Sequence, residues 1–309
     1  MAYTGATTPD VGTDSTNDLQ RDITLDVLQA FERRTRFMNI IRVDDASGTG
    51  AASGSFIIEG KEDKTNGALA TYGTGTQVSV SNGTQDEIII AIDRPQYESR
   101  RIDKWKEAVA RYDVSAMNVR QLGARLANAI DRKVSAAIEA ASLATGLVSN
   151  GDGTVIVNTV LPGGAAAATT AEGKGNAIAE SIYAAVAAVQ TNDVYDELYV
   201  AMNPTNYSYL PQSSRAVSTE FTSGNGGYDN GEVKMIGGAT VFSTNNLPAT
   251  AGLIALAFTT EAAGMVKLWD VQVDINPQPD FLNAKLINAY FSNGVAALRP
   301  QCAVSIKNV

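Results

Sequence analysis

The sequence contains no histidine and a single cysteine, Cys302, among its 309 residues. Without histidine, neither a Ser-His-Asp triad nor a Cys-His pair can be built. One cysteine excludes an internal disulfide and any zinc site based on cysteines. Cys302 lies in an apolar stretch, so we expect it to be a small buried core residue. These absences remove most of the common catalytic and metal-binding arrangements.

Charged residues are scarce, at 18% of the chain against the usual quarter. Small neutral polar residues replace them, and these lose little side-chain entropy against a partner, which is consistent with self-association. No stretch approaches the ~20 apolar residues needed to span a bilayer. The polar, acidic N-terminus lacks the apolar run of a signal peptide. We therefore expect a soluble protein made in a reducing cytoplasm, and an apolar content of 44% predicts a real core.

The net charge of −9 argues against a dedicated nucleic-acid binder, but the charge is unevenly distributed. From Arg94 to Lys133 there are ten Lys and Arg against five Asp and Glu, whereas from Ala144 onward there are seven against thirteen. This basic region has two interpretations. It is either a solvated helix face with ion pairs between subunits or a surface that tolerates a polyanion through phosphate contacts.

The strongest periodic pattern predicts a helix that begins after Asp113, a good N-cap, and runs to Leu143. Thirty helical residues would extend ~45 Å. Gly123 interrupts the pattern at a cost of up to ~1 kcal/mol, and the close approach of another backbone is one reason to tolerate it. The preceding short helix is expected to carry an apolar stripe. The positions that carry the two patterns are Ile102, Trp105 and Val109, then Val114, Met117, Leu122, Leu126, Ile130, Val134, Ile138 and Ala141.

An extended arm is expected before these helices. Strand patterns at Ser55–Glu59, Thr76–Val80 and Glu87–Asp93, with a turn at Asn82-Gly83, predict a long antiparallel hairpin. Its polar, Gly-rich tip, Lys61 to Gly75, has too few apolar residues for a core of its own. We therefore expect the arm to find support on another chain, and residues 1–17 to form a second, N-terminal arm.

The remainder reads as a mixture of helices and strands without an internal repeat. We expect a hairpin near residues 154–160, a helix over 176–189, and a strand over 196–202 that Asn203-Pro204 ends. A short helix capped by Thr205 follows. A strand pair surrounds Gly237-Gly238, residues 212–231 form a projecting loop, and further strands complete the C-terminal part.

The search for catalytic or binding chemistry yields no motif. There is no phosphate-binding loop, and Asn150–Gly153 fails the spacing of a calcium loop. Adjacent carboxylates such as Glu62-Asp63 point to opposite faces of a strand and suit solvation better than catalysis. Lys61 and Lys64, near the arm tip, are either solvated or paired with acidic groups of a neighbouring subunit. We predict no catalytic, cofactor-binding or metal-binding residues.

Several stretches, taken in order, resemble the major capsid protein of tailed bacteriophages, which has the HK97-type shell fold, and within it the coat proteins of short-tailed podophages. RYDVSAMNVRQLGARLANAIDRKVSAAI resembles the long spine helix with its Tyr-Asp start. Residues 56–93 resemble the extended arm. Residues 197–210 resemble the strand-Pro-helix passage of the axial domain, and residues 233–248 resemble its Gly-containing strand pair. The stretches AFTTEAAGMVKLWDVQV and NGVAALRPQCAVSIK resemble the strands that return to the peripheral domain.

The resemblance implies an α+β, HK97-like capsid fold with an N-terminal arm, an extended β-hairpin arm (the E-loop), a long spine helix, and peripheral and axial domains. The implied domains are residues 1–53 for the N-terminal arm and helix, 54–93 for the E-loop, 94–145 plus 265–309 for the peripheral domain, and 146–264 for the axial domain.

The resemblance also implies hexamers and pentamers that close into an icosahedral shell around double-stranded DNA. Expected partners are other copies of the chain, a scaffolding protein, a portal protein, packaged DNA bound non-specifically and in some cases a decoration protein, with no membrane. The protein would be a structural virion component, not an enzyme, assembled in the host bacterial cytoplasm. Some members cross-link a Lys to an Asn, but no motif here selects such a pair.

Two groups of residues become contact candidates on this basis. Lys61, Glu62, Asp63 and Lys64 are candidates for contacts between subunits. Arg120, Arg125, Arg132 and Lys133 are candidates for a basic face that points to the DNA or to a neighbouring subunit. The loop of residues 212–231 is expected near the symmetry axis of the capsomer.

Three alternatives remain open. An encapsulin-like nanocompartment shell would share the fold but enclose enzymes. A β-rich tail or surface protein that binds a host ligand would lack a central long helix. An enzyme would have to work with Lys and carboxylates alone.

Overall fold

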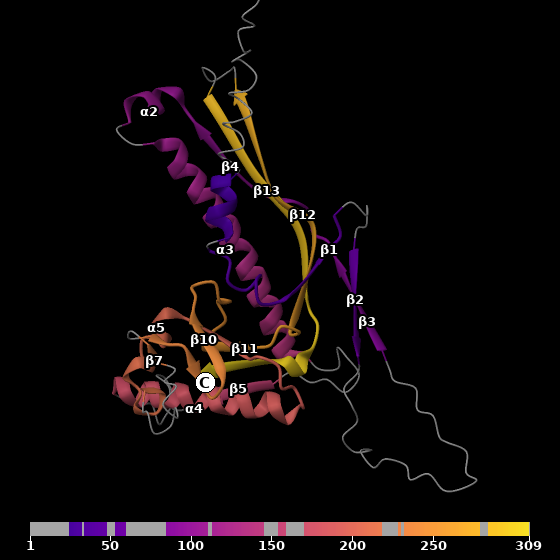
Figure 1. Cartoon of the computed structure of the whole chain (residues 1–309), viewed down its shortest axis with the longest axis vertical. Coiled ribbons are helices and arrows are strands. Elements are labelled where there is room, and N and C mark those ends of the chain that lie inside the picture. Colours follow the sequence, from indigo (N-terminus) through magenta and orange to yellow (C-terminus); the bar gives the residue numbers. More distant parts are fainter. Residues whose placement is uncertain are drawn as a thin grey trace, which may run out of the picture. The chain divides into compact units, whose positions relative to one another are not determined.

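The structure is a computed structural model that describes residues 25–32, 34–47, 53–59, 85–110, 113–144, 154–158, 170–217, 228–229, 232–278 and 284–308 (Figure 1). The chain divides into two compact units. Unit 1 comprises Met1–Arg36, Asp93–Ile130 and Lys267–Asn293, and unit 2 comprises Phe37–Ile92, Asp131–Val266 and Gly294–Val309. Each unit is described by itself below.

The helical elements include one long helix and one of intermediate length, and the others are short. Residues 25–32 are helical. The others are α2 (Lys104–Val109), α3 (Val114–Leu143), α4 (Ala171–Thr191), α5 (Pro204–Tyr207), η2 (Leu210–Gln212), α6 (Ser214–Val217) and η4 (Pro300–Cys302).

The strands form two larger sheets and two short ribbons. They are β1 (Arg42–Asp45), β2 (Ser53–Glu59), β3 (Gln85–Ala91), β4 (Gln96–Ile102), β5 (Thr154–Asn158), β6 (Tyr199–Met202), β7 (Tyr228–Asp229), β8 (Glu232–Val233), β9 (Met235–Ile236), β10 (Ala239–Ser243), β11 (Leu253–Phe258), β12 (Ala263–Gln278), β13 (Ala284–Ala297) and β14 (Ala303–Asn308). One sheet has the order β1-β12-β13-β4 and the other β5-β14-β11-β6-β10-β9, while β2 pairs with β3 and β7 with β8.

In unit 1, the first part of α3 packs closely against the helix of residues 25–32. The predicted N-cap is confirmed, because the backbone N–H of Ala116 donates to the Asp113 carboxylate over 3.0 Å. A Cβ placed on Gly123 would lie 2.6 Å from the carbonyl oxygen of Val27. The predicted reason for this glycine, the close approach of another backbone, is therefore confirmed. The helix of residues 25–32 buries Val27 and Phe31, while Leu25 is exposed.

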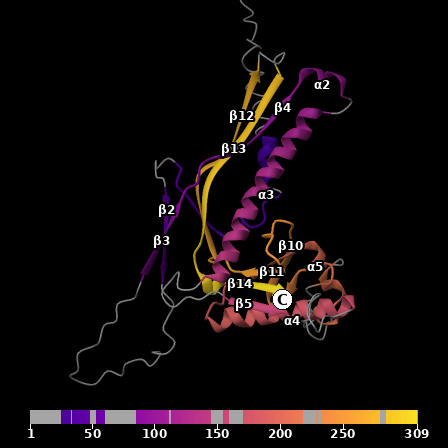
Figure 2. The ribbon, with the colours of Figure 1, turned by 180° about the vertical axis from the view of Figure 1, so that it is seen from behind.

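In unit 2, the six-stranded sheet holds an apolar core. Strand β11 is almost wholly buried, as expected for a central strand, and pairs antiparallel with β14 and β6. Helix α4 contacts β5, β11 and β14, and lies across this sheet in both views (Figures 1 and 2). Thr170 caps α4 by accepting from the N–H of Gly173 over 3.1 Å. Phe37 packs against Phe258, with ring centroids 5.6 Å apart.

Buried polar groups fix the second part of α3 within unit 2. The carboxylate of Asp131, fully buried, accepts hydrogen bonds from the backbone N–H of Phe37 (3.2 Å) and the side-chain amide of Asn246 (3.4 Å). One turn further on, the Ser135 hydroxyl donates to the carbonyl oxygen of Asn246 over 2.6 Å. Since buried polar groups are costly when unpaired, this network specifies one position for the helix.

The root of the predicted arm is the antiparallel pair β2–β3. One face of the pair contributes Phe56 and Ile90 to a core with Val266. The other face leaves Ile57 62% and Ile89 66% exposed. The expected strand at 76–80 and the arm tip with Lys61–Gly75 lie outside the described residues.

Several local predictions were wrong. Ile102 ends strand β4, opposite Lys285, and does not belong to the short helix. The remaining residues of its expected stripe, Trp105 and Val109, are 76% and 61% exposed. The cap of α5 is Asn203, whose side chain accepts from the N–H of Thr205, because Pro204 occupies the first helical position. Residues 154–158, where a hairpin was expected, form the single strand β5, which pairs in parallel with β14.

Candidate subunit-contact surfaces

The structure separates the predicted basic residues into two places. Arg120 and Arg125 lie on α3 within unit 1, and both are exposed. Arg132 is exposed and Lys133 half-buried on the part of α3 that belongs to unit 2. The other predicted contact residues, at positions 61 to 64, lie outside the described residues. Their role stays a prediction.

Arg120 and Arg125 line one open groove in unit 1, which we call the α3 groove. Its volume is about 1040 Å³. Residues recurring every three or four positions along one stripe of α3 form its wall, and one residue that follows the helix of 25–32 joins them. These residues are Asp113, Ala116, Met117, Arg120, Gln121, Ala124, Arg125 and Asn128, with Arg34. At a rise of about 1.5 Å per residue, the stripe extends ~22 Å.

The α3 groove is positively charged. It holds three arginines and one carboxylate, Asp113, which already accepts the cap hydrogen bond of α3. Arg125 forms an ion pair with Glu98 of strand β4. Arg34 and Arg120 form no ion pair with any residue that the structure describes. The groove therefore presents two uncompensated guanidinium groups, which suit a carboxylate or phosphate partner.

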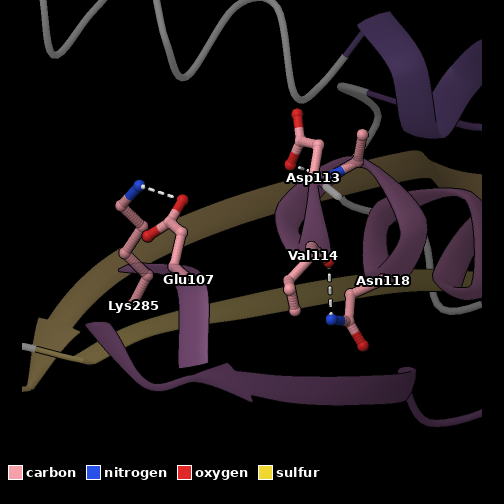
Figure 3. Close-up of polar contacts among 6 residues, drawn as sticks. Glu107, Asp113, Val114, Asn118 and Lys285 are labelled. Carbon is pink, nitrogen blue, oxygen red and sulfur yellow. Dashed lines mark hydrogen bonds and ion pairs between the residues drawn. The ribbon is translucent and has the colours of Figure 1, made fainter. Parts of the chain in front are cut away.

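Helix α2, beside the start of α3, is held mainly by ion pairs. Lys285 donates to Glu107 over 3.3 Å, as Figure 3 shows together with the cap at Asp113. Asp103 pairs with Arg101 and Lys106 at 3.4 and 3.8 Å. No residue of α2 is buried. Because ion pairs that remain accessible to solvent contribute only ~0–1 kcal/mol each, α2 has little support from the described part of its own chain.

The start of α3 has a second local contact in the same view. The Asn118 side-chain amide donates to the carbonyl oxygen of Val114 over 2.8 Å (Figure 3).

Helix α2 presents the largely exposed side chains of Trp105 and Val109. An exposed tryptophan beside an exposed valine on a short, weakly supported helix is consistent with a surface that another molecule covers, so α2 is a contact candidate.

Aromatic residues of unit 1 gather on adjacent strands of the four-stranded sheet. Tyr97 of β4, 75% exposed, lies opposite Tyr290 of β13. The ring of Tyr290 packs edge-on against Trp269 of β12, at 6.2 Å between centroids. Desolvation and the charge of Asp274 raise the pKa of Tyr290 above its usual value. This sheet face is a further candidate contact surface.

Unit 2 has its own exposed residues at the turn between β9 and β10. Gly237 and Gly238 adopt positive φ angles of 59° and 85°. A Cβ on Gly237 would lie 2.9 Å from the ring of Tyr183. Glycine is therefore required at this position both for the positive φ angle and for the space that the Tyr183 ring occupies. Met235 and Tyr195, 49% and 75% exposed, add apolar surface in unit 2.

Among the described residues, no group of three or more carboxylate or cysteine side chains is placed to hold a metal ion. Burial raises the pKa of the Cys302 thiol to about 11, so at neutral pH the thiol is protonated and a poor nucleophile. In the part of the chain that the structure describes, no helix combines the length and apolar character needed to cross a membrane.

The groove itself was missed by sequence reasoning, although two of its arginines were named. The sequence does contain a pattern that could have predicted the groove. Small, amide and arginine side chains recur every three or four positions along α3, on a different side of the helix from its main apolar stripe. Arg34 joins that stripe only because residues 25–32 pack at Gly123, a contact between distant parts of the sequence.

Comparison with known proteins gives a consistent result. A family model described as Gp10A-like, major capsid protein, matches residues 72–255. The capsid structure of the cyanophage P-SCSP1u is similar with a TM-score of 0.72 and 26% identity, over 89% of this chain and 88% of that one. No curated protein matches.

Two other solved structures are similar at lower identity. The mature capsid of bacteriophage PhiM1 has a TM-score of 0.67 and 14% identity, with 89% of this chain and 87% of that chain covered. Mycobacterium phage Che8 has a TM-score of 0.61 and 18% identity, with 88% and 90% covered. At these identities the similarity shows the fold alone.

Proposed function

The chain belongs to the Gp10A-like family of major capsid proteins, whose model it matches over residues 72–255, and on this premise we propose that its copies assemble as hexamers and pentamers around double-stranded DNA. It is a coat protein of the tailed-phage type, and it forms the icosahedral shell. The predicted α+β fold of the HK97 type is confirmed. The family match is the observation that carries this conclusion.

The three alternative functions, a β-rich tail or surface protein, an encapsulin-like shell and an enzyme, have less support. Helix α3, with 30 residues, is the central long helix that a β-rich tail or surface protein was expected to lack. The match to a capsid family also favours a virus shell over an encapsulin-like nanocompartment. The family is a structural one, and we propose that the chain has no catalytic activity.

We propose that the exposed apolar surfaces become contacts between neighbouring copies. The arm, residues 54–93, would lie over a neighbour, and the exposure of Ile57 and Ile89 on one face of its root supports this. Lys61, Glu62, Asp63 and Lys64 at its tip would pair with charged groups of that neighbour. Burial of both isoleucines would contribute roughly 3 kcal/mol or more.

The domain assignment follows the same reasoning. Unit 1 supports a peripheral domain within the proposed residues 94–145 plus 265–309, since it contains the first part of α3 and most of β12 and β13. Unit 2 contains α4 and the six-stranded sheet, and five of the six strands lie within the axial domain that we propose at residues 146–264. The sixth strand, β14, comes from Ala303–Asn308, so the C-terminal end of the chain would join this domain. Residues 1–53 and 54–93 would form the N-terminal and E-loop segments, and the loop of 212–231 would lie near the capsomer axis.

The remaining partners are proposed from the family alone. They are a scaffolding protein, a portal protein, non-specifically packaged DNA and a decoration protein, with assembly in the host bacterial cytoplasm before the chain becomes part of the virion. Arg120, Arg125, Arg132 and Lys133 would form basic faces toward DNA or a neighbour. Since Arg125 already pairs with Glu98 and the chain carries a net charge of −9, the geometry favours protein contacts at the α3 groove.

Electron microscopy tests the proposal directly. The purified chain, co-expressed with its scaffold, should form closed shells or capsomers. Replacing Ile57 and Ile89 together by aspartate should leave the chain folded, because both are exposed, but should abolish shells. Gln190→Asp, an exposed substitution on α4, is the matched control and should assemble normally. Persistent monomers of the parental chain would refute a shell function, whereas normal shells from the double variant would refute only the role of the arm.

A further inference from the structure

The α3 groove is a charged surface whose specific partner the proposed shell contacts do not identify. Its arginines outnumber its carboxylates by three to one, and Arg34 and Arg120 have no ion pair with a described residue. Ala116, Met117 and Ala124 give it a neutral floor between the charges. A groove of this kind fits an extended or helical peptide with regularly placed carboxylates.

The chain contains one such peptide near the groove in sequence. Residues 1–24 carry aspartates at 10, 14, 18 and 22, each four positions after the last, and only one basic side chain, Arg21. The charge of this segment therefore complements that of the groove. Apolar side chains at Leu19 and Ile23 would suit its neutral floor.

The segment is also tethered close to the groove. It ends at Thr24, directly before the helix of residues 25–32, which packs on α3 at Gly123, and Arg34 just after that helix lines the groove. A 24-residue chain extends at most ~80 Å, and as a random coil it spans ~27 Å, close to the ~22 Å length of the α3 stripe. A tether of this length gives an effective concentration of about millimolar, so the contacts of the whole segment together need only a dissociation constant in the millimolar range to occupy the groove.

We propose that the α3 groove is the docking site of the acidic N-terminal segment, residues 1–24, of the same chain in the unassembled subunit. Arg34 and Arg120 receive the aspartates, and the segment shields the positive charge of the groove from other polyanions. This inference concerns the single subunit, so it holds or fails independently of the proposed shell.

Cross-linking of the full-length chain tests the proposal. Asn17→Cys combined with Gln121→Cys keeps all four aspartates and all three groove arginines. A short bis-maleimide should join the two cysteines within one chain. Native Cys302 is fully buried and its thiol is protonated, so it does not compete. Asn17→Cys with Ala136→Cys, exposed on the same helix outside the groove, is the matched control.

Three dependences identify the cause of the cross-link. Adding Arg120→Gln should lower the yield about two- to fivefold, as expected for the loss of one exposed ion pair. Replacing Asp14 and Asp18 by asparagine should act in the same direction. Salt near 1 M should also reduce the yield, since it screens charges beyond about 3 Å. Mixing chains grown with and without heavy nitrogen should give cross-links of single label, which shows that each segment binds its own chain.

Several results would overturn the proposal. These are an equal yield with the Ala136→Cys control, a majority of mixed-label cross-links, or a yield unchanged by both charge removals. Complete displacement by an equimolar DNA duplex would also overturn it, because the groove would then be a phosphate site. A yield unaffected by equimolar duplex supports the segment as occupant.

Discussion

Replacing Gly123 by alanine sets two known effects of opposite sign against each other at one position of α3. Alanine is the better helix former, which would stabilise the helix by up to ~1 kcal/mol. The added Cβ, however, would lie 2.6 Å from the carbonyl oxygen of Val27 and 2.9 Å from the Cβ of Ala30. Ordinary contacts of this kind are 3.4 Å or more, so the two helices would have to separate by close to 1 Å.

The steric cost of the added Cβ should exceed the gain in helix propensity. Overpacking costs about 1–3 kcal/mol, and the upper part of that range applies because the opposing atom is backbone and not the end of a flexible side chain. The net prediction for Gly123→Ala is a destabilisation of about 1–2 kcal/mol. With a shift of about 2–4 °C per kcal/mol for chains of comparable size, the Tm should fall by roughly 2–8 °C.

The assay is urea unfolding of the unassembled chain followed by circular dichroism, with calorimetry for the Tm. Ala129→Gly is the matched control, since Ala129 is exposed on the same helix and its loss measures propensity alone, at about 1 kcal/mol. If Gly123→Ala unfolds at a higher urea concentration than the parental chain, the close approach of residues 25–32 to α3 is refuted.

Three further substitutions probe the caps and buried groups. Asp113→Ala removes the 3.0 Å cap bond of α3 and should cost about 1 kcal/mol by urea unfolding, whereas Asp113→Asn should cost little. Asp131→Ala leaves the N–H of Phe37 without its acceptor and should cost about 3 kcal/mol; a loss below 1 kcal/mol would contradict the buried network. Cys302, with a pKa raised from 9.0 to about 11, retains its proton longer in the folded chain. Its contribution to the free energy of unfolding is therefore complete below pH 9 and is lost as the pH rises through about 11, by up to about 2–3 kcal/mol. The free energy of unfolding of Cys302→Ala should depend less on pH over this range.

The long helix could be predicted from the sequence because its signals are local and agree with one another. An N-cap at Asp113 and apolar residues at helical spacing define α3 as Val114–Leu143, as observed. Gly123 was correctly interpreted as a packing position, since a glycine inside a helix needs a reason to be there. The partner that approaches it, residues 25–32, lies about 90 positions away and could not be identified from local patterns.

The apolar pattern before α3 shows where such reasoning fails. Ile102, Trp105 and Val109 are spaced as one helix face, but Ile102 pairs with Lys285 across strands β4 and β13. Tertiary pairing overrides helical spacing here, because the hydrogen bonds of β13 extend β4 to the residue before Asp103. Periodicity also identifies an apolar face without indicating whether its partner belongs to the same chain, and Trp105 is 76% exposed.

The candidate site was predicted only in part for a similar reason. Arg120 and Arg125 were named from an excess of local positive charge, and both do line the α3 groove. Arg132 and Lys133 were grouped with them because they share the helix, yet they belong to unit 2. A helix this long passes through different surroundings, so charges close in sequence do not share one surface.

The weak support of α2 links its own stability to assembly. A six-residue helix is far below the ~12–15 residues at which isolated helices become even marginally stable. Its ion pairs, the half-buried pair of Lys285 with Glu107 and the more exposed pair of Lys106 with Asp103, remain accessible to solvent and contribute little. Burial of Trp105 and Val109 against a neighbouring copy would add about 1.5–3 kcal/mol for each side chain, more than the ion pairs supply. If α2 makes this contact, its order and the formation of the contact form one coupled equilibrium, in which each stabilises the other by the same amount.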